Sequence, residues 1–163
     1  MARNKKTDAL EKKRKFEQIA STLEEIDSAS FLKDNFLPYA WSNTLNRSIS
    51  DVSGLKPVQR RILYTMFKRG LSPGANRAKV ATLGGAVLAY HPAGDASVND
   101  ALKNLARAHV FRVPMIEIKG DEGSPGTDGA APRYIEARLN EAGWLNVAEL
   151  SENAVEMIPN YDA

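Results

Sequence analysis

The sequence predicts a mainly helical α+β domain, and three observations lead to this fold class. Apolar residues recur at helical spacing through most of the chain before His109. Two of these helical segments, residues 80–88 and 95–108, are separated by one short turn, which is typical of a helix-turn-helix. After His109 come partial strand-like alternation and a loop rich in glycine, proline and aspartate at residues 120–131. Helices followed by a small β wing predict a winged helix-turn-helix domain.

The N-terminal segment predicts a helical arm. Asp8 can cap a first helix, because apolar residues follow it at helical spacing. The Ser-Ala-Ser at residues 28–30 is expected to end this helix. Lysines and arginines crowd residues 5–15, and solvated helix faces explain them better than a phosphate-binding surface does. We therefore predict an N-terminal basic helical arm over residues 1–29 and a winged-helix domain over residues 30–163.

Two further helices are predicted before the helix-turn-helix. One covers about residues 31–49. Its expected core residues are Phe36, Tyr39, Ala40 and Leu45. The other begins at Pro57, because a proline in the first turn lacks only an N–H that would have no partner there. Gly70 and the Ser-Pro-Gly at residues 72–74 end this second helix.

The two helices of the helix-turn-helix both carry an apolar stripe. The stripe of the first is formed by Val80, Leu83, Gly84, Val87 and Leu88. Asp95 is expected to cap the second helix, which buries Val98, Leu102 and Leu105. Its outward residues are expected to be Asn99, Lys103, Asn104 and Arg107. This second helix is the candidate reader of a DNA groove, and an ordinary αα-hairpin in a helical core is the alternative.

The segment beyond the helix-turn-helix predicts the β wing. Val110, Arg112 and residues 114–118 are expected to form a strand with partial alternation, and residues 132–135 a short extended stretch. A helix is then expected to run through Leu139.

Composition excludes several classes of protein and site. With 163 residues the chain fits one domain and an added arm. It has no cysteine, which excludes disulfides, thiolate metal sites and cysteine nucleophiles. With two histidines a zinc site made by this chain alone is not expected. No apolar run approaches the roughly 20 residues of a membrane helix, so we expect a cytoplasmic protein with no membrane partner.

Three short motifs stand in order along the chain. They are GLKPVQRR at residues 54–61, YHPAGD at residues 90–95 and the pair Arg133-Tyr134. A phenol is a poor nucleophile at neutral pH unless a cation favours the phenolate, and Arg133 is such a cation. A tyrosine beside a cation within a basic helical platform suits the exchange of a DNA phosphodiester for a phosphotyrosine. A tyrosine taken alone is more often a half-buried strand aromatic.

In their order and spacing the motifs resemble the A subunit of bacterial type IIA topoisomerases, the family of DNA gyrase and topoisomerase IV. The resemblance covers about residues 31–162 and leaves gyrase and topoisomerase IV both open. It implies an enzyme that changes DNA topology through a transient 5′-phosphotyrosine link. The family's tower, coiled coil and C-terminal domain are absent from these residues. We therefore expect a fragment-sized A subunit that is inactive by itself.

The resemblance also assigns catalytic residues. In the family the catalytic tyrosine directly follows an arginine, which makes Tyr134 the nucleophile and Arg133 its electrostatic support. His91 matches the first histidine of the family's YHPHGD, and its alternative role is a satisfied turn histidine. Arg47 matches a family arginine that lies beside the scissile phosphate.

The DNA contacts are expected to come from two helices. Lys56, Arg60 and Arg61 belong to the GLKPVQRR motif, where arginine forks suit phosphate oxygens. Lys103 and Arg107 lie on the helix that follows YHPAGD. A solvated fringe of the helix is the alternative role of the cations in the first motif.

Several positions depart from the family's pattern. Ala93 stands at the second histidine of YHPHGD, and Gln59 at a histidine common in the first motif. Asn99 stands where a tyrosine is usual, and Ala96 where a serine is common. Residues 120–124 read GDEGS in place of GNFGS. These departures lie at surfaces expected to touch DNA or a partner, whereas the pattern of core residues is intact.

Two classes of function follow. In the first, the chain is the strand-cleaving domain of a topoisomerase A subunit. Its partners are then double-stranded DNA, a second copy bound through the winged-helix face, and a topoisomerase B subunit. The B subunit would hold Mg²⁺ with its carboxylates and would use ATP, whereas this chain would hold no metal. In the second class, the chain is a non-catalytic or engineered winged-helix module that keeps the fold and the binding but not the cleavage.

Overall fold

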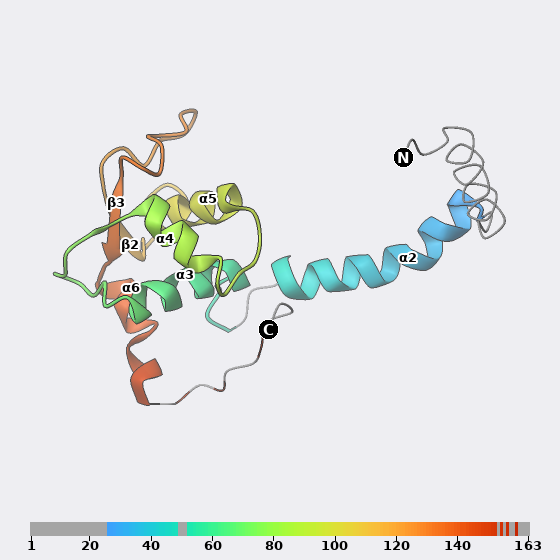
Figure 1. Cartoon of the computed structure of the whole chain (residues 1–163), viewed down its shortest axis with the longest axis horizontal. Coiled ribbons are helices and arrows are strands. Elements are labelled where there is room, and N and C mark those ends of the chain that lie inside the picture. The colour runs from blue at the N-terminus through green and yellow to red at the C-terminus, as the bar shows by residue number, and fades with distance from the viewer. Residues whose placement is uncertain (1–25, 49–51, 153, 155, 157–158, 160–163) are drawn as a thin grey trace, which may run out of the picture. The chain divides into compact units, whose positions relative to one another are not determined.

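The computed structural model describes residues 26–48, 52–152, 154, 156 and 159. The chain divides into two compact units, Met1–Thr44 and Leu45–Ala163 (Figure 1). The predicted first helix and the basic cluster fall outside the described residues. The predicted boundary at residue 29 therefore stays a prediction.

The described part of the first unit is helix α2, Ser28–Asn43. The prediction that residues 28–30 break a helix is wrong, because they begin one. The carboxylate of Asp27 accepts a hydrogen bond from the backbone N–H of Ser30 at 3.0 Å and so caps the helix. A π-helical turn, Thr44–Ser48, follows α2.

The core expected for this segment is not buried within this chain. Helix α2 contains no buried residue, and Phe36 and Tyr39 are exposed. Leu45, in the π-helical turn, is also exposed. Large apolar residues and polar residues such as Lys33 and Asn35 are spread around the helix without one distinct apolar face.

The second unit has the element order of a winged helix-turn-helix, which confirms the predicted fold class. Its elements are α3 (Pro57–Lys68), β1 (Ala78–Lys79), α4 (Val80–Val87), α5 (Asp95–Ala106), β2 (Ile116–Lys119), β3 (Glu136–Leu139), α6 (Glu141–Leu145) and the 3₁₀ turn Ala148–Glu152 (Figure 1). Helix α3 begins at Pro57 as predicted, and Gln59 Oε1 accepts the Lys56 backbone N–H at 2.8 Å. Among the described residues, no helix has the length and apolar character that a membrane crossing requires.

The sheet is antiparallel, with the strand order β1-β3-β2. Ile116 pairs with Leu139, and Lys119 pairs with Glu136. The prediction of a helix through Leu139 is therefore wrong, because a helix begins only at Glu141. Ala137 and Leu139 are buried and alternate with half-buried neighbours, so the segment presents one face to the core as a strand does.

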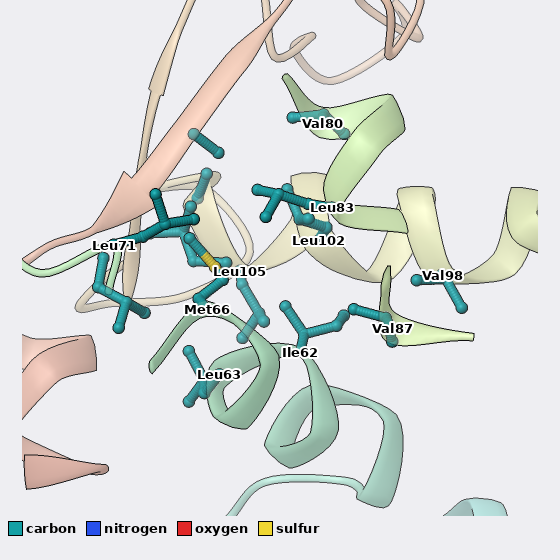
Figure 2. Close-up of a cluster of buried hydrophobic side chains, with 14 of the residues drawn as sticks. Ile62, Leu63, Met66, Leu71, Val80, Leu83, Val87, Val98, Leu102 and Leu105 are labelled. Carbon is teal, nitrogen blue, oxygen red and sulfur yellow. The ribbon is translucent and has the colours of Figure 1, made fainter. Parts of the chain in front are cut away.

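The core lies where α3, α4 and α5 meet the sheet. Figure 2 shows Ile62 and Met66 of α3 close to Leu102 and Leu105 of α5, and all four side chains are fully buried. Leu83 reaches the same cluster from α4. Val98, Leu102 and Leu105 are buried as predicted, which confirms the apolar face of the second helix of the pair.

Where α4 and α5 cross, Gly84 faces the Asn99 side chain. A Cβ at Gly84 would lie 2.5 Å from Asn99 Oδ1, so a larger residue there would have to displace the Asn99 side chain. The N-cap of α5 lies one residue earlier in the chain than the predicted cap, Asp95. This N-cap is Gly94, and the Asp95 carboxylate accepts only the neighbouring Ala96 N–H at 2.9 Å.

Candidate functional site

A pocket of about 380 Å³ lies beside the turn between α4 and α5. It is lined by Asn46, Arg47, Val58, His91, Pro92, Ala93, Gly94 and Ser97. The π-helical turn contributes Arg47, and the start of α3 contributes Val58. The fold therefore brings residues of the first two sequence motifs to one place, together with the arginine that precedes them.

His91 and Arg61 form the polar centre beside this pocket. Arg61 Nη1 lies 2.6 Å from His91 Nδ1. A guanidinium can only donate, so Nδ1 accepts and the ring proton is assigned to Nε2. Burial lowers the pKa of His91, and the cations of Arg61 and Arg47 lower it further. At neutral pH His91 is therefore a neutral imidazole whose Nε2–H can donate to an anion.

This pKa shift predicts a pH dependence. Because the pKa of His91 in the folded chain lies below its ordinary value of 6.5, protonation favours the unfolded chain. The contribution of the neutral imidazole to the free energy of unfolding is complete above pH 6.5. It is lost as the pH falls through the pKa that His91 has in the folded chain. We expect the Arg61→Gln variant to raise the pKa of His91, as measured by NMR titration of its ring. An unchanged titration would show that Arg61 does not act on the imidazole.

An aromatic pair between α3 and the turn that carries His91 supports this turn. The rings of Tyr64 and Tyr90 lie edge to face, with their centroids 5.1 Å apart. Lys68 Nζ lies 5.6 Å from the centroid of the Tyr64 ring. The backbone N–H of His91 donates to Val87 O at 2.8 Å, which ties the turn to the end of α4. The imidazole is thus positioned by both helices.

Tyr134 is exposed, at 69%, in the turn that leads into β3. The carbonyls on either side of the Arg133-Tyr134 pair are hydrogen bonded to α4. Pro132 O accepts from the Ala81 N–H, and Ile135 O accepts from the Val80 N–H, both at 3.1 Å. The first N–H groups of a helix have no partner within it, so α4 uses them to hold this turn. The phenol is therefore presented to solvent on a fixed backbone.

Arg133 lies beside Tyr134. Its guanidinium carbon is 5.6 Å from the centroid of the tyrosine ring, within the range of a cation–π contact. Both side chains are exposed, so either could meet a ligand. Among the described residues, no hydrogen bond or ring contact joins Tyr134 to His91 or Arg61. The structure thus forms two clusters: the pocket cluster (Arg47, Arg61 and His91) and the tyrosine cluster (Arg133 and Tyr134).

The remaining predicted DNA contacts fall into two groups. Lys56 is exposed and Arg60 is half-buried, both at the start of α3. On α5, by contrast, Lys103 is only 7% exposed, so the prediction that it points outward is wrong. Lys103 Nζ donates to Asp128 O, and Arg107 donates to the carbonyls of Glu122 and Asp128. The loop after β2 folds over this face of α5 and takes up both cations.

Sequence reasoning missed three residues of the pocket region. Asn46 and Ser97 line the pocket, and Tyr64 supports the turn that carries His91. Helical spacing offered a signal for Tyr64, because residues three apart on a helix are neighbours and Arg61 was already assigned. No comparable signal marks Asn46 or Ser97.

Comparison with known proteins gives these clusters a context. The family model for the A subunit of DNA gyrase/topoisomerase IV matches residues 47–163. This chain belongs to that family. The matched range begins at Arg47, so it contains every residue of the pocket cluster and the tyrosine cluster.

Relatives of both kinds of A subunit are found. The chain is 40% identical over 147 residues to the DNA gyrase A subunit of Mycobacterium tuberculosis (strain CDC 1551 / Oshkosh), which covers 86% of this chain and 17% of that protein. It is 42% identical over 140 residues to the DNA gyrase A subunit of Deinococcus deserti, covering 84% of this chain and 17% of the relative. It is 40% identical over 143 residues to the DNA topoisomerase 4 A subunit of Rickettsia felis, covering 86% and 19%.

The chain thus spans less than a fifth of the length of these gyrase and topoisomerase relatives. Its departures from the family's motifs have local structural roles. Gln59 accepts the Lys56 N–H at the start of α3, and Asn99 packs against Gly84 at the crossing of α4 and α5. Ala93 lines the pocket beside His91, where it offers no hydrogen-bonding group.

Proposed function

We propose that this chain is the DNA-binding and strand-cleaving domain of a type IIA topoisomerase A subunit. One observation carries the proposal. An exposed tyrosine, with a guanidinium over its ring, stands on a turn that is hydrogen bonded to the first N–H groups of a helix. A nucleophile on a fixed backbone beside a cation is what attack on a phosphodiester requires.

In the proposed reaction Tyr134 Oη attacks the phosphorus of a DNA strand. The phenol loses its proton, a bond forms between Oη and phosphorus, and the bond from phosphorus to the 3′ oxygen breaks. The 3′ oxygen takes a proton and leaves as a hydroxyl, so the 5′ end remains on the tyrosine. Because this ester conserves the energy of the original bond, attack by the 3′ hydroxyl restores the strand. Arg133 offsets the charge that grows on the phosphate.

The pocket cluster is proposed to contact the phosphate backbone. Arg47 is exposed and carries a permanent charge. The neutral imidazole of His91 offers its Nε2–H, because Nδ1 is already occupied by Arg61. A neutral donor and a fixed cation beside one pocket suit hydrogen bonding to phosphate oxygens without a proton being transferred to them.

Lys56, Arg60 and Arg61 are proposed to bind further phosphates. Double charge reversal of Lys56 and Arg60 should weaken DNA binding and make it less dependent on salt. Each lost phosphate contact flattens the slope of log affinity against log salt by about 0.9. We expect the slope, measured by fluorescence anisotropy, to fall by about two units.

A matched control for this DNA prediction is Arg69→Glu. Arg69 is the C-cap of α3, at the opposite end of the helix from Lys56. The Arg69→Glu substitution changes the charge by the same amount per site. It should leave the slope of log affinity against log salt nearly unchanged. If the double variant keeps the slope of the unmodified chain, the DNA does not lie on the start of α3.

Mg²⁺ and ATP are proposed to act through a partner B subunit. Among the residues that the structure describes, no three histidine, aspartate or glutamate side chains gather as a metal site would require. We therefore propose that carboxylates of the B subunit, and not the described residues of this chain, hold the ion. Mg²⁺ supplies charge stabilisation in phosphoryl transfer when it is bound.

Protein partners are also proposed from the exposed apolar surface. Helix α2 exposes Phe31, Leu32, Phe36, Leu37, Tyr39 and Trp41. This exposed apolar surface fits contact with a B subunit. We further propose that a second copy binds through the winged-helix face. The cytoplasm, where bacterial DNA lies, is the proposed location.

The direct test of the proposed function is covalent capture. The chain is incubated with a topoisomerase B subunit, Mg²⁺ and supercoiled plasmid, and SDS is then added. We expect DNA linked to the chain through tyrosine. If the B subunit co-purifies with the chain but no adduct forms, the result favours the non-catalytic module, which the alanine at position 93 would then explain.

A further inference from the structure

The wing loop, residues 120–131, is closed on itself at its neck. The Ala130 N–H donates to Asp121 O at 3.0 Å, and Ser124 and Thr127 are paired at the tip. Gly129 has φ of +73°, and a Cβ there would lie 2.4 Å from the backbone nitrogen of Gly123. The two sides of the neck are therefore in direct backbone contact, and the loop has a defined shape.

Two cations of α5 hold this neck. Arg107 Nε donates to Glu122 O at 2.8 Å, and its Nη2 donates to Asp128 O at 3.3 Å. Lys103 Nζ donates to the same Asp128 carbonyl at 3.2 Å. Arg107 thus joins the incoming and outgoing sides of the neck, and Lys103 adds a second bond to the outgoing side.

Both cations are committed to the loop. Lys103 is buried, and the third nitrogen of the Arg107 guanidinium donates to Asn104 Oδ1 at 3.0 Å. A Cβ at Gly123 would lie 2.5 Å from Arg107 Nη2, so the loop leaves room for the guanidinium by having a glycine there. The fork of arginine, with several N–H groups in fixed directions, suits such a bond to two carbonyls, and a lysine cannot replace it.

We propose that Lys103 and Arg107 are positioning residues for Tyr134, which they hold through the wing loop and do not contact. The outgoing side of the neck runs from Asp128 to Ala131, whose carbonyl accepts the Tyr134 N–H at 2.9 Å. Helix α4 holds the turn itself through the carbonyls of Pro132 and Ile135, whereas Ala131 belongs to the loop. Loss of the hydrogen bonds from Lys103 and Arg107 therefore frees the loop segment that enters the turn from upstream. This inference rests on the proposed role of Tyr134 as nucleophile.

The experiment compares Arg107→Gln, Arg107→Lys and Lys103→Met in the full chain. Amide hydrogen exchange of residues 121–130 should rise about tenfold or more, since a charge-assisted hydrogen bond is lost. The rate of covalent adduct formation with B subunit, Mg²⁺ and plasmid should fall about ten- to a hundredfold, because misplacement of a reacting group slows attack. Arg112→Gln, an exposed arginine just beyond α5, is the matched control and should change neither.

The charge-conserving variant separates positioning from DNA binding. Under the proposal, Arg107→Lys behaves like Arg107→Gln in both measurements, and neither changes the salt dependence of DNA affinity. If Arg107 bound a phosphate, the lysine would keep the affinity and the glutamine would lose it. That second pattern would overturn the proposal.

Two other outcomes would also overturn it. One is amide exchange in the wing loop that stays unchanged in both Arg107→Gln and Lys103→Met. Lys103→Met is the milder substitution and keeps the test valid if the Arg107 variants fold poorly. The other is faster exchange with an unchanged rate of adduct formation. An unmodified chain that gives no adduct, although the B subunit binds it, rejects the proposed function and the positioning role together. The amide hydrogen exchange then still reports whether Lys103 and Arg107 hold the wing loop.

Discussion

We expect the Tyr134→Phe variant to form no covalent adduct with DNA. The substitution removes the attacking oxygen and keeps the ring, which is exposed and lies beside Arg133. The fold and the non-covalent affinity for DNA should therefore stay nearly unchanged. SDS capture with Mg²⁺ and the B subunit measures the adduct, and anisotropy measures the affinity.

Two further variants make this experiment specific. Arg133→Ala should slow adduct formation by about 10²- to 10³-fold, the usual effect of removing one group that stabilises transition-state charge. Tyr39→Phe removes a second exposed phenol, on α2, and should leave the adduct intact. An adduct that persists in Tyr134→Phe would place the nucleophile on another residue.

The second large effect concerns the core. Leu102→Ala should lower the free energy of unfolding by about 2–5 kcal/mol, because a fully buried leucine leaves a cavity when it is truncated. Leu102 lies where α5 meets α3 and α4, so the wall of the cavity belongs to three helices that cannot all move inward. Urea unfolding followed by circular dichroism measures the change.

Leu145→Ala is the matched control for this stability prediction. Leu145 is 75% exposed on α6, so the same truncation removes little contact. Its effect should stay within about 0.5 kcal/mol. Equal losses in the two variants would mean that α5 is not packed as the structure has it.

The exposed residues of α2 show where an apolar pattern does not predict burial. Phe36 and Tyr39 are expected in a core because large apolar residues are usually buried. They are exposed within this chain. Composition indicates that a surface is apolar, but the identity of the surface that covers it depends on other segments or other chains.

The β wing shows a limit of local patterns. Residues 136–139 form a strand because they pair with β1 and β2, which lie far away along the chain. Four residues are too few for alternation to distinguish a strand from the start of a helix. The sequence did contain the signal for the helix-turn-helix, where two long apolar stripes face one another across a short turn.

The sequence by itself determined the fold class, the apolar faces of α4 and α5, and the motifs that place the chain in its family. These features depend on neighbours within a few residues, or on identities that a motif preserves. The tertiary structure alone decided which atoms the cations meet. Arg61 donates to His91, and Lys103 and Arg107 donate to the wing loop, because hydrogen-bond acceptors from distant segments lie within reach of those cations in the folded chain.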